Sequence, residues 1–473
     1  MRTRTDTMRL ALAGLGILGG LLGAALPARA QRAWDQAYGN LSNNSFVNAT
    51  TKLPVAARWA YQLDGAVVAG GPSVSPKSGT IYVGTAKGTL WGFLPDGTLR
   101  CSQNFKNSTI TSTPAIFPNG DVAILVTRPD GEKRQTALAR LSADCGLVWQ
   151  VDLPRRRAEP SRATGSVKIW TLKGTSFLFV HGRDTIDIDL TVDAPISFHE
   201  LLVFDEAGQI FARRQVGDNC IRVCGGSDCG SWGNPWELIT DFWPAGVSTP
   251  LYETYGWPDS TPAILDTTLR GYATPSSPMV AVTDHNCSVR LEILQFDPAA
   301  APADRLVKRW GDFAEEDRTL LSSPAVTWDG LVVFGTSGHR VRVYDLMTHS
   351  LKWSYDTTYP VMHPPAMAFD AWIAPSDKLV HFLKPYTGGL LGTARPQPVP
   401  VGGLAGGLAA SLNEVVVPHF DELGIWTHDL INMTHALTNE NFRTSSPALT
   451  PEGRLYVVAQ TNELSLLFGF GPP

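Results

Sequence analysis

Ser322-Ser323-Pro324-Ala325-Val326 opens a unit of four short apolar segments. The turn Thr327-Trp328-Asp329-Gly330 leads into the second segment, Leu331-Val332-Val333-Phe334-Gly335, and residues 341–345 and 351–355 supply the third and fourth. Short apolar runs rich in Val, Phe and Tyr and separated by turn residues are typical of β-strands. The unit therefore predicts four strands joined by tight turns.

The same order of segments recurs along the chain. Pro72 and Pro114 are 42 residues apart, and Pro324 and Pro365 are 41 apart. A period of about 40 residues with four strands per repeat is typical of β-propeller blades. Weaker copies fill the gaps, so that units start near residues 71, 112, 164, 261, 323, 364, 407 and 446. We expect an all-β fold, an eight-bladed β-propeller of four-stranded blades; seven blades remain an alternative because two starts are degenerate.

The last unit lacks its fourth strand. After residues 464–468 the sequence reaches Pro473 without another apolar segment, whereas residues 58–63 precede the first unit and have the missing pattern, including Trp59. Pairing the first and last segments removes the open edges of a ring. We therefore expect the N-terminal strand to complete the last blade.

The first 30 residues have the pattern of a signal peptide. Arg2, Arg4 and Arg9 precede a short apolar run, and Ala28-Arg29-Ala30 has the small-x-small pattern of a cleavage site. We expect residues 1–30 to be removed and residues 31–473 to form the propeller, soluble in the periplasm or secreted. The net charge of −5 argues against a nucleic-acid partner, and no later run is long enough for direct membrane insertion.

The repeat resembles that of a known superfamily. Val343-Tyr344-Asp345 followed by Leu351-Lys352-Trp353 is the clearest copy, and residues 140–149 form another. The lead-in Trp34-Asp35-Gln36-Ala37-Tyr38-Gly39-Asn40 adds to the likeness. These motifs are similar to the PQQ-like repeat of the quinoprotein alcohol dehydrogenase-like superfamily, including its non-enzymatic branch of outer-membrane assembly factors. The outer-strand Trp of this repeat is expected to wedge against the neighbouring blade.

The six cysteines are expected to form disulfides, since an even count in an exported chain favours that state. They are Cys101, Cys145, Cys220, Cys224, Cys229 and Cys287. Zinc at the clustered trio is the rival interpretation, although its spacing is not a standard zinc pattern. Against the repeat, Cys101 takes the place of the Trp and Cys145 that of a turn Gly in the next blade. The resemblance therefore favours a Cys101–Cys145 pair, with Cys287 joining one of the trio.

An insertion at residues 218–259 interrupts the repeat between the third and fourth units. It holds three cysteines and is rich in aromatic residues: Trp232, Trp236, Phe242, Trp243, Tyr252, Tyr255 and Trp257. Long loops often carry function, and Trp and Tyr are common anchors at interfaces. The insertion is interpreted either as a binding surface or as a small core that covers the ring.

The sequence favours a binding or scaffolding protein without catalytic residues, cofactor or metal. The superfamily's alcohol dehydrogenases use PQQ and calcium with a vicinal Cys pair, and this chain has no adjacent cysteines. Its ten His are scattered without a His-Glu-x-x-His motif, and the acidic alternation at residues 184–189 fits a strand. We expect an unidentified protein partner; the alternative is a PQQ- and calcium-dependent quinoprotein dehydrogenase.

Overall fold

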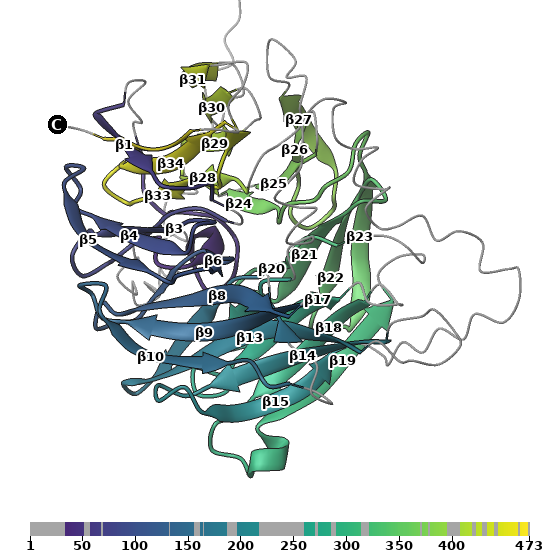
Figure 1. The fold of residues 1–473 in the computed structure, drawn as a ribbon. Coiled ribbons are helices and arrows are strands. Elements are labelled where there is room, and N and C mark those ends of the chain that lie inside the picture. Colours follow the sequence, from purple (N-terminus) through teal and green to yellow (C-terminus); the bar gives the residue numbers. More distant parts are fainter. Residues whose placement is uncertain are drawn as a thin grey trace, which may run out of the picture.

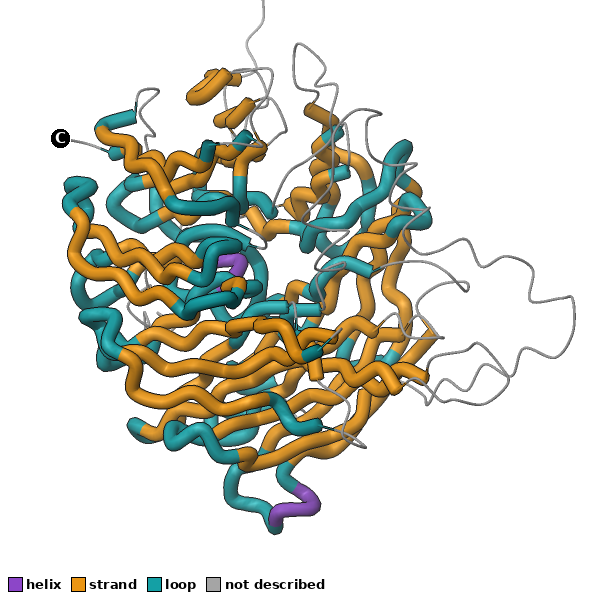
Figure 2. Tube along the Cα trace, in the orientation of Figure 1, coloured by secondary structure: helices purple, strands orange, loops and turns teal. Residues whose placement is uncertain are grey.

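The computed structural model shows strands arranged around a common centre (Figure 1). It describes residues 34–51, 57–67, 70–131, 133–155, 161–163, 165–186, 196–216, 260–269, 273–284, 290–313, 321–368, 371–376, 379–394, 407–418, 422–427, 433–438, 443–461 and 464–471. Regular structure in these ranges consists of strands and two short 3₁₀ helices, η1 (Ala37–Gly39) and η2 (Pro302–Asp304) (Figure 2). None of their helices is long and apolar enough to cross a membrane. The prediction of an all-β propeller is confirmed.

The described strands form eight antiparallel sheets, which we number as blades 1 to 8. Blade 1 contains β2 (Ser73–Val74), β3 (Ile81–Gly84), β4 (Thr89–Phe93) and β5 (Leu99–Asn104). Blade 2 contains β6 (Thr109–Ile110), β7 (Ala115–Ile116), β8 (Val122–Asp130), β9 (Lys133–Leu141) and β10 (Leu147–Asp152). Blade 3 contains β11 (Ser161–Arg162), β12 (Lys168–Leu172), β13 (Thr175–Ile186), β14 (Ile196–Phe204) and β15 (Ile210–Val216). Blade 4 contains β16 (Ala263–Leu265), β17 (Met279–Asp284), β18 (Arg290–Phe296) and β19 (Leu306–Phe313).

The remaining four sheets follow in chain order. Blade 5 contains β20 (Ala325–Val326), β21 (Leu331–Thr336), β22 (Arg340–Asp345) and β23 (Ser350–Asp356). Blade 6 contains β24 (Ala366–Ala368), β25 (Ala371–Pro375), β26 (Val380–Leu383) and β27 (Leu390–Ala394). Blade 7 contains β28 (Ala409–Ala410), β29 (Glu414–Pro418), β30 (Glu422–Thr427) and β31 (Met433–Thr438). Blade 8 contains β32 (Arg443–Thr444), β33 (Ala448–Leu449), β34 (Leu455–Gln460), β35 (Ser465–Phe470) and β1 (Trp59–Leu63).

The two ends of the chain close the ring, as the sequence predicted. Strand β1 pairs antiparallel with β35, from Trp59 opposite Gly469 to Leu63 opposite Ser465. The backbone N–H of Arg58 adds a hydrogen bond to the carbonyl of Gly469 at 2.8 Å. The last blade is therefore built from both termini, and the edge of β35 is covered.

Outer-strand tryptophans join successive blades. Trp59 packs so closely on Gly97 of blade 1 that a Cβ on this glycine would lie 2.6 Å from the indole ring. Its indole N–H donates a hydrogen bond to the carbonyl of Pro95 at 3.0 Å. The same pair of contacts recurs between blades 2 and 3 and between blades 5 and 6, at Trp149 with Gly208 and Glu206, and at Trp353 with Gly388 and Pro385.

A disulfide takes the place of this contact between blades 1 and 2. Cys101 stands on the outer strand where other blades have Trp, and it is bonded to Cys145, with an S–S distance of 2.09 Å. Cys145 occupies the turn position of the glycines and has a positive φ of 61°. This is the pairing that the repeat favoured. The covalent bond therefore replaces the Trp–Gly contact at the same point of the architecture.

The Ser/Thr pair that opens the repeats ties four of the blades internally through its first hydroxyl. The Oγ of Ser322 accepts a hydrogen bond from the backbone N–H of Gly335 on β21 at 2.9 Å. Ser112, Ser260 and Ser445 make equivalent bonds to β8, β17 and β34, the strands that pair with the short inner strands of their blades. These bonds hold the chain to its blade just before the short inner strand, which itself makes few ladder hydrogen bonds.

The second hydroxyl of the pair links neighbouring blades. Thr261 Oγ1 accepts a hydrogen bond from the backbone N–H of Ser166 in blade 3, and the N–H of Thr261 donates to Ser323 Oγ in blade 5, both at 2.9 Å. We call this series the hydroxyl relay; its other bonds run from Gly71 to Thr113, from Thr113 to Ser166 and from Gly407 to Ser446. The repeated motif is therefore an inter-blade hydrogen-bonding device.

Residues 34–51 lie at the centre of the ring and run past the inner strands in order (Figure 1). Each of the first seven blades donates one backbone N–H to this central segment. The donors and acceptors are Val74 to Trp34, Ile116 to Asp35, Ile169 to the Gln36 side chain, Ile264 to Leu41, Val326 to Ser42, Met367 to Asn44 and Ala410 to Ser45. The lead-in motif thus satisfies inner-strand N–H groups that face away from the ladders.

Replacing Thr261 by Val tests the hydroxyl relay. Valine has nearly the same shape but accepts no hydrogen bond, so the buried N–H of Ser166 loses its partner. We expect the free energy of unfolding to fall by about 1–3 kcal/mol, measured by urea denaturation. Thr261→Ser keeps the hydroxyl and is the matched control, with a clearly smaller loss. Equal losses in the two variants would contradict the role of the relay.

Candidate functional site

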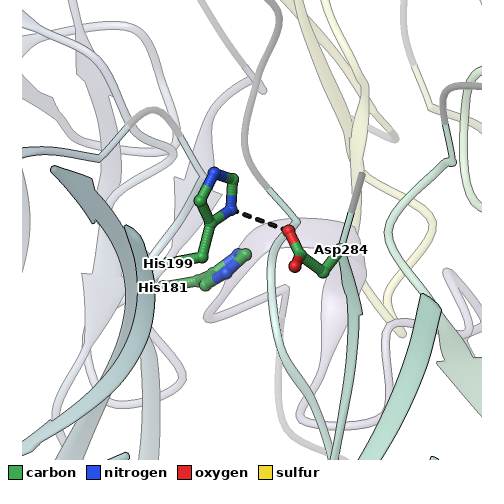
Figure 3. A group of neighbouring side chains, drawn as sticks. All are labelled: His181, His199 and Asp284. Carbon is green, nitrogen blue, oxygen red and sulfur yellow. Dashed lines mark ion pairs between the residues drawn. The ribbon is translucent and has the colours of Figure 1, made fainter. Parts of the chain in front are cut away.

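Three buried polar side chains from blades 3 and 4 meet and form the candidate site. His181 lies on β13, His199 on β14 and Asp284 at the end of β17. Their possible ligand atoms all lie within 4.8 Å of one another, and each residue is at most 3% exposed. Figure 3 shows the carboxylate of Asp284 directed at His199, with the His181 ring beside both.

Strand register explains why the two imidazoles share a face. His181 is opposite Leu201 and His199 is opposite Arg183 in the β13–β14 ladder, so the two histidines are diagonal neighbours. Their ring centroids are 5.5 Å apart, with the planes tilted by 59°. Asp284 arrives from the next blade, and its Oδ1 is 2.7 Å from Nδ1 of His199. The site is therefore assembled from three paired strands and two blades.

The cluster is the polar end of an otherwise apolar interface. Because side chains alternate along a strand, His181 follows Phe179 on the same face of β13, and Asp284 follows Val282 on the same face of β17. Phe179 and Val282 belong to one buried hydrophobic cluster that joins blades 3 and 4. Burial of a carboxylate and two imidazoles in such a layer is costly unless they are partnered. The three residues therefore form a polar cluster at the end of the apolar interface between blades 3 and 4.

A second buried polar feature holds the central segment. The Lys168 ammonium of β12 is fully buried and donates hydrogen bonds to the carbonyl oxygens of Ala37, at 2.5 Å, and of Asn40. Burial lowers the pKa of Lys168 from 10.5 to about 7, while the carboxylate of Asp35 acts in the opposite direction. Lys168 therefore anchors the turn at η1 rather than offering a free amine.

Most of the site residues predicted from the sequence lie outside the described residues. These are Cys220, Cys224, Cys229, Cys287, Trp232, Trp236, Phe242, Trp243, Tyr252, Tyr255 and Trp257. Signal-peptide residues 1–30 and the insertion at 218–259 also lie outside the described ranges. The predicted binding surface on the insertion therefore stays a prediction. Of the acidic alternation, Asp184 lies in strand β13, where the strand interpretation placed it.

The sequence interpretation did not select the His181–His199–Asp284 cluster. Its members are 18 and 85 residues apart, and no short motif connects them. One local signal is present: His181 directly follows the apolar run Phe177-Leu178-Phe179-Val180, where a strand interior is expected. A histidine in such a run is expected to be buried, but the strand register that places His199 beside it and the blade contact that brings Asp284 belong to the tertiary structure.

The fold and its blade-to-blade contacts are those of a β-propeller, and solved propeller structures are similar to it. BamB from Moraxella catarrhalis is similar over 90% of this chain and 98% of that chain, with a TM-score of 0.51 and 14% identity. A europium-containing methanol dehydrogenase is similar over 94% and 99%, with a TM-score of 0.58 and 11% identity. Quinohemoprotein alcohol dehydrogenase from Comamonas testosteroni is similar over 93% and 81%, with a TM-score of 0.56 and 11% identity.

These likenesses extend over nearly the whole chain, but the identities are low. No protein family matches the sequence, and no curated protein does either. The similarity therefore establishes a shared fold, and it includes both dehydrogenases and BamB.

The buried Lys168 makes stability depend on pH. Its pKa is 10.5 in the unfolded chain and about 7 in the fold, so between these values the unfolded state binds more protons. The free energy of unfolding should therefore rise with pH from about 7 to 10, by up to about 1.4 kcal/mol per unit. Lys168→Met removes the titrating group and should remove this rise. Urea titrations of both proteins across this range measure the difference; parallel pH profiles would contradict it.

Proposed function

We propose that the protein is an exported propeller that acts as a binding or scaffolding protein, in the periplasm or outside the cell, without enzymatic activity. The observation that carries this proposal is an exposed group on blades 5 and 6, which we call the turn patch: Trp328, Met347 and Tyr386. These side chains are 64%, 40% and 56% exposed. Large aromatic residues held in water by a rigid scaffold are frequent anchors of protein interfaces.

Hydrogen bonds fix the turns that carry the patch. The Tyr386 hydroxyl donates to Oδ2 of Asp329, the residue after Trp328, at 2.9 Å. The N–H of Leu346, next to Met347, donates to the carbonyl of Gly330 at 3.0 Å. The three turns therefore hold one another in place, and little conformational entropy is lost when a partner binds.

The fold likeness supports a protein partner. BamB is covered over 98% of its length, so its whole propeller corresponds to this one. The repeat also resembles that of outer-membrane assembly factors, and the aromatic insertion at residues 218–259 offers a second predicted surface. We propose that the partner is a protein bound through exposed aromatic side chains.

A capture experiment tests the turn patch. The immobilised protein is incubated with an envelope extract of the source cells, and bound proteins are compared between wild type and the double variant Trp328→Ala, Tyr386→Ala. We expect the specific partner to be reduced at least tenfold. Val148→Ala is the matched control, because Val148 is 54% exposed on blade 2. Deletion of 218–259 tests the insertion in parallel; undiminished capture by both altered proteins would contradict the proposal.

The alternative function is a PQQ- and calcium-dependent dehydrogenase, which the likeness to methanol dehydrogenase favours. The His181–His199–Asp284 cluster does not fit the calcium of such an enzyme. Calcium takes six to eight oxygen ligands, whereas this group offers two imidazole nitrogens and one carboxylate. The sequence also lacks the vicinal Cys pair of the alcohol dehydrogenases.

Incubation with PQQ and calcium separates the two functions. We expect no stoichiometric quinone absorbance after gel filtration and no dye-linked oxidation of alcohols. A quinoprotein dehydrogenase reconstituted under the same conditions shows that the assay detects binding. One bound quinone per chain would overturn the non-enzymatic proposal.

A further inference from the structure

We propose that His181, His199 and Asp284 bind a divalent transition-metal ion, with zinc the best fit, and that this ion fastens blade 3 to blade 4. The proposal is independent of the partner-binding function. It rests on the donor set, on its burial and on the strands that carry it.

The donor set suits a transition metal. Two imidazole nitrogens and one carboxylate oxygen are common ligands of zinc, and the same combination binds other first-row divalent ions. A fourth, open position is typical of sites with three protein ligands. Hard cations are disfavoured, because magnesium and calcium prefer an all-oxygen shell.

The distances are close to those of a coordination sphere. Ligand atoms around a tetrahedral zinc are about 3.3 Å apart, since each bond is about 2.0–2.2 Å long. The potential ligand atoms of the cluster lie within 4.8 Å of one another, and Nδ1 of His199 is 2.7 Å from Oδ1 of Asp284. Small side-chain rotations, which shift each ligand atom by about 1 Å, therefore bring the three donors around one ion.

The scaffold is rigid and dry. His181 and His199 lie in the continuous β13–β14 ladder, and Asp284 ends the segment of β17 that is paired with β18. All three residues are at most 3% exposed, so an ion here competes with little water. A bound cation compensates the buried carboxylate, and such compensation is strong where the surroundings are apolar.

An ion at this position would link two neighbouring blades. The cluster joins blades 3 and 4, which are also the blades that the insertion at 218–259 connects along the chain. This long connection replaces the short one found between regular units. An ion held by both blades fixes their relative position independently of that connection.

Metal titration of the full chain tests the proposal directly. The purified protein is stripped with a chelator, and zinc is added while binding is followed by competition with a chromophoric indicator. We expect one zinc per chain and a melting temperature that rises by a few degrees in excess zinc. Cobalt should bind the same site and give the visible absorption of a tetrahedral nitrogen–oxygen site. Absence of saturable binding would overturn the proposal.

Two variants locate the site. Asp284→Asn keeps the shape but removes the anionic ligand, and we expect at least a hundredfold loss of zinc affinity and loss of the cobalt spectrum. His199→Gln is the second variant, should Asp284→Asn fail to fold as judged by circular dichroism. His339→Ala removes an exposed histidine elsewhere and should bind like wild type. Unchanged affinity in the folded site variants would place the zinc elsewhere, for example at the clustered cysteines, and would refute the proposal.

Discussion

The hydroxyl relay is the interaction on which the ring depends. Inner strands are only two or three residues long in most blades, so their own ladders supply few hydrogen bonds. A backbone N–H such as that of Thr261 has no ladder partner on its inner side, and burial leaves no water to replace one. The hydroxyl of the next blade fills this need. The blades that the relay joins are therefore incomplete without their neighbours, which favours a ring over separate sheets.

The centre and the rim of the ring solve the same problem in different ways. At the centre, residues 34–51 provide acceptors for one N–H of each of the first seven blades. At the rim, an outer-strand Trp packs on the turn glycine of the next blade, and the disulfide of Cys101 and Cys145 substitutes for that contact once. Lys168 adds a buried amine to the centre, and backbone carbonyls offset only part of the desolvation that lowers its pKa. Contacts between blades thus occur at three distances from the centre of the ring: at the central segment, at the hydroxyl relay and at the outer strands.

Regular and irregular parts of the chain have separate roles. The regular blades 5 and 6 present exposed aromatic turns, on which the proposed binding of a protein rests. The irregular region around blades 3 and 4 contains the buried His181–His199–Asp284 group and the long insertion. Propellers of similar fold include dehydrogenases as well as BamB, so the fold alone leaves the activity open. The chemistry of particular side chains has to decide it.

The sequence by itself determined the strands, the repeat and the closure by Trp59, and the resemblance of its repeat favoured the Cys101–Cys145 pair that the structure shows. Each of these follows from a pattern of fixed period, because equivalent positions in successive blades have equivalent neighbours. The tertiary structure decided what the period does not encode. It showed that the Ser/Thr pair bonds across blades, that the lead-in segment lines the centre, and that His181, His199 and Asp284 meet. Strand register brings His181 and His199 together within blade 3, and Asp284 reaches them only because blade 4 packs against blade 3.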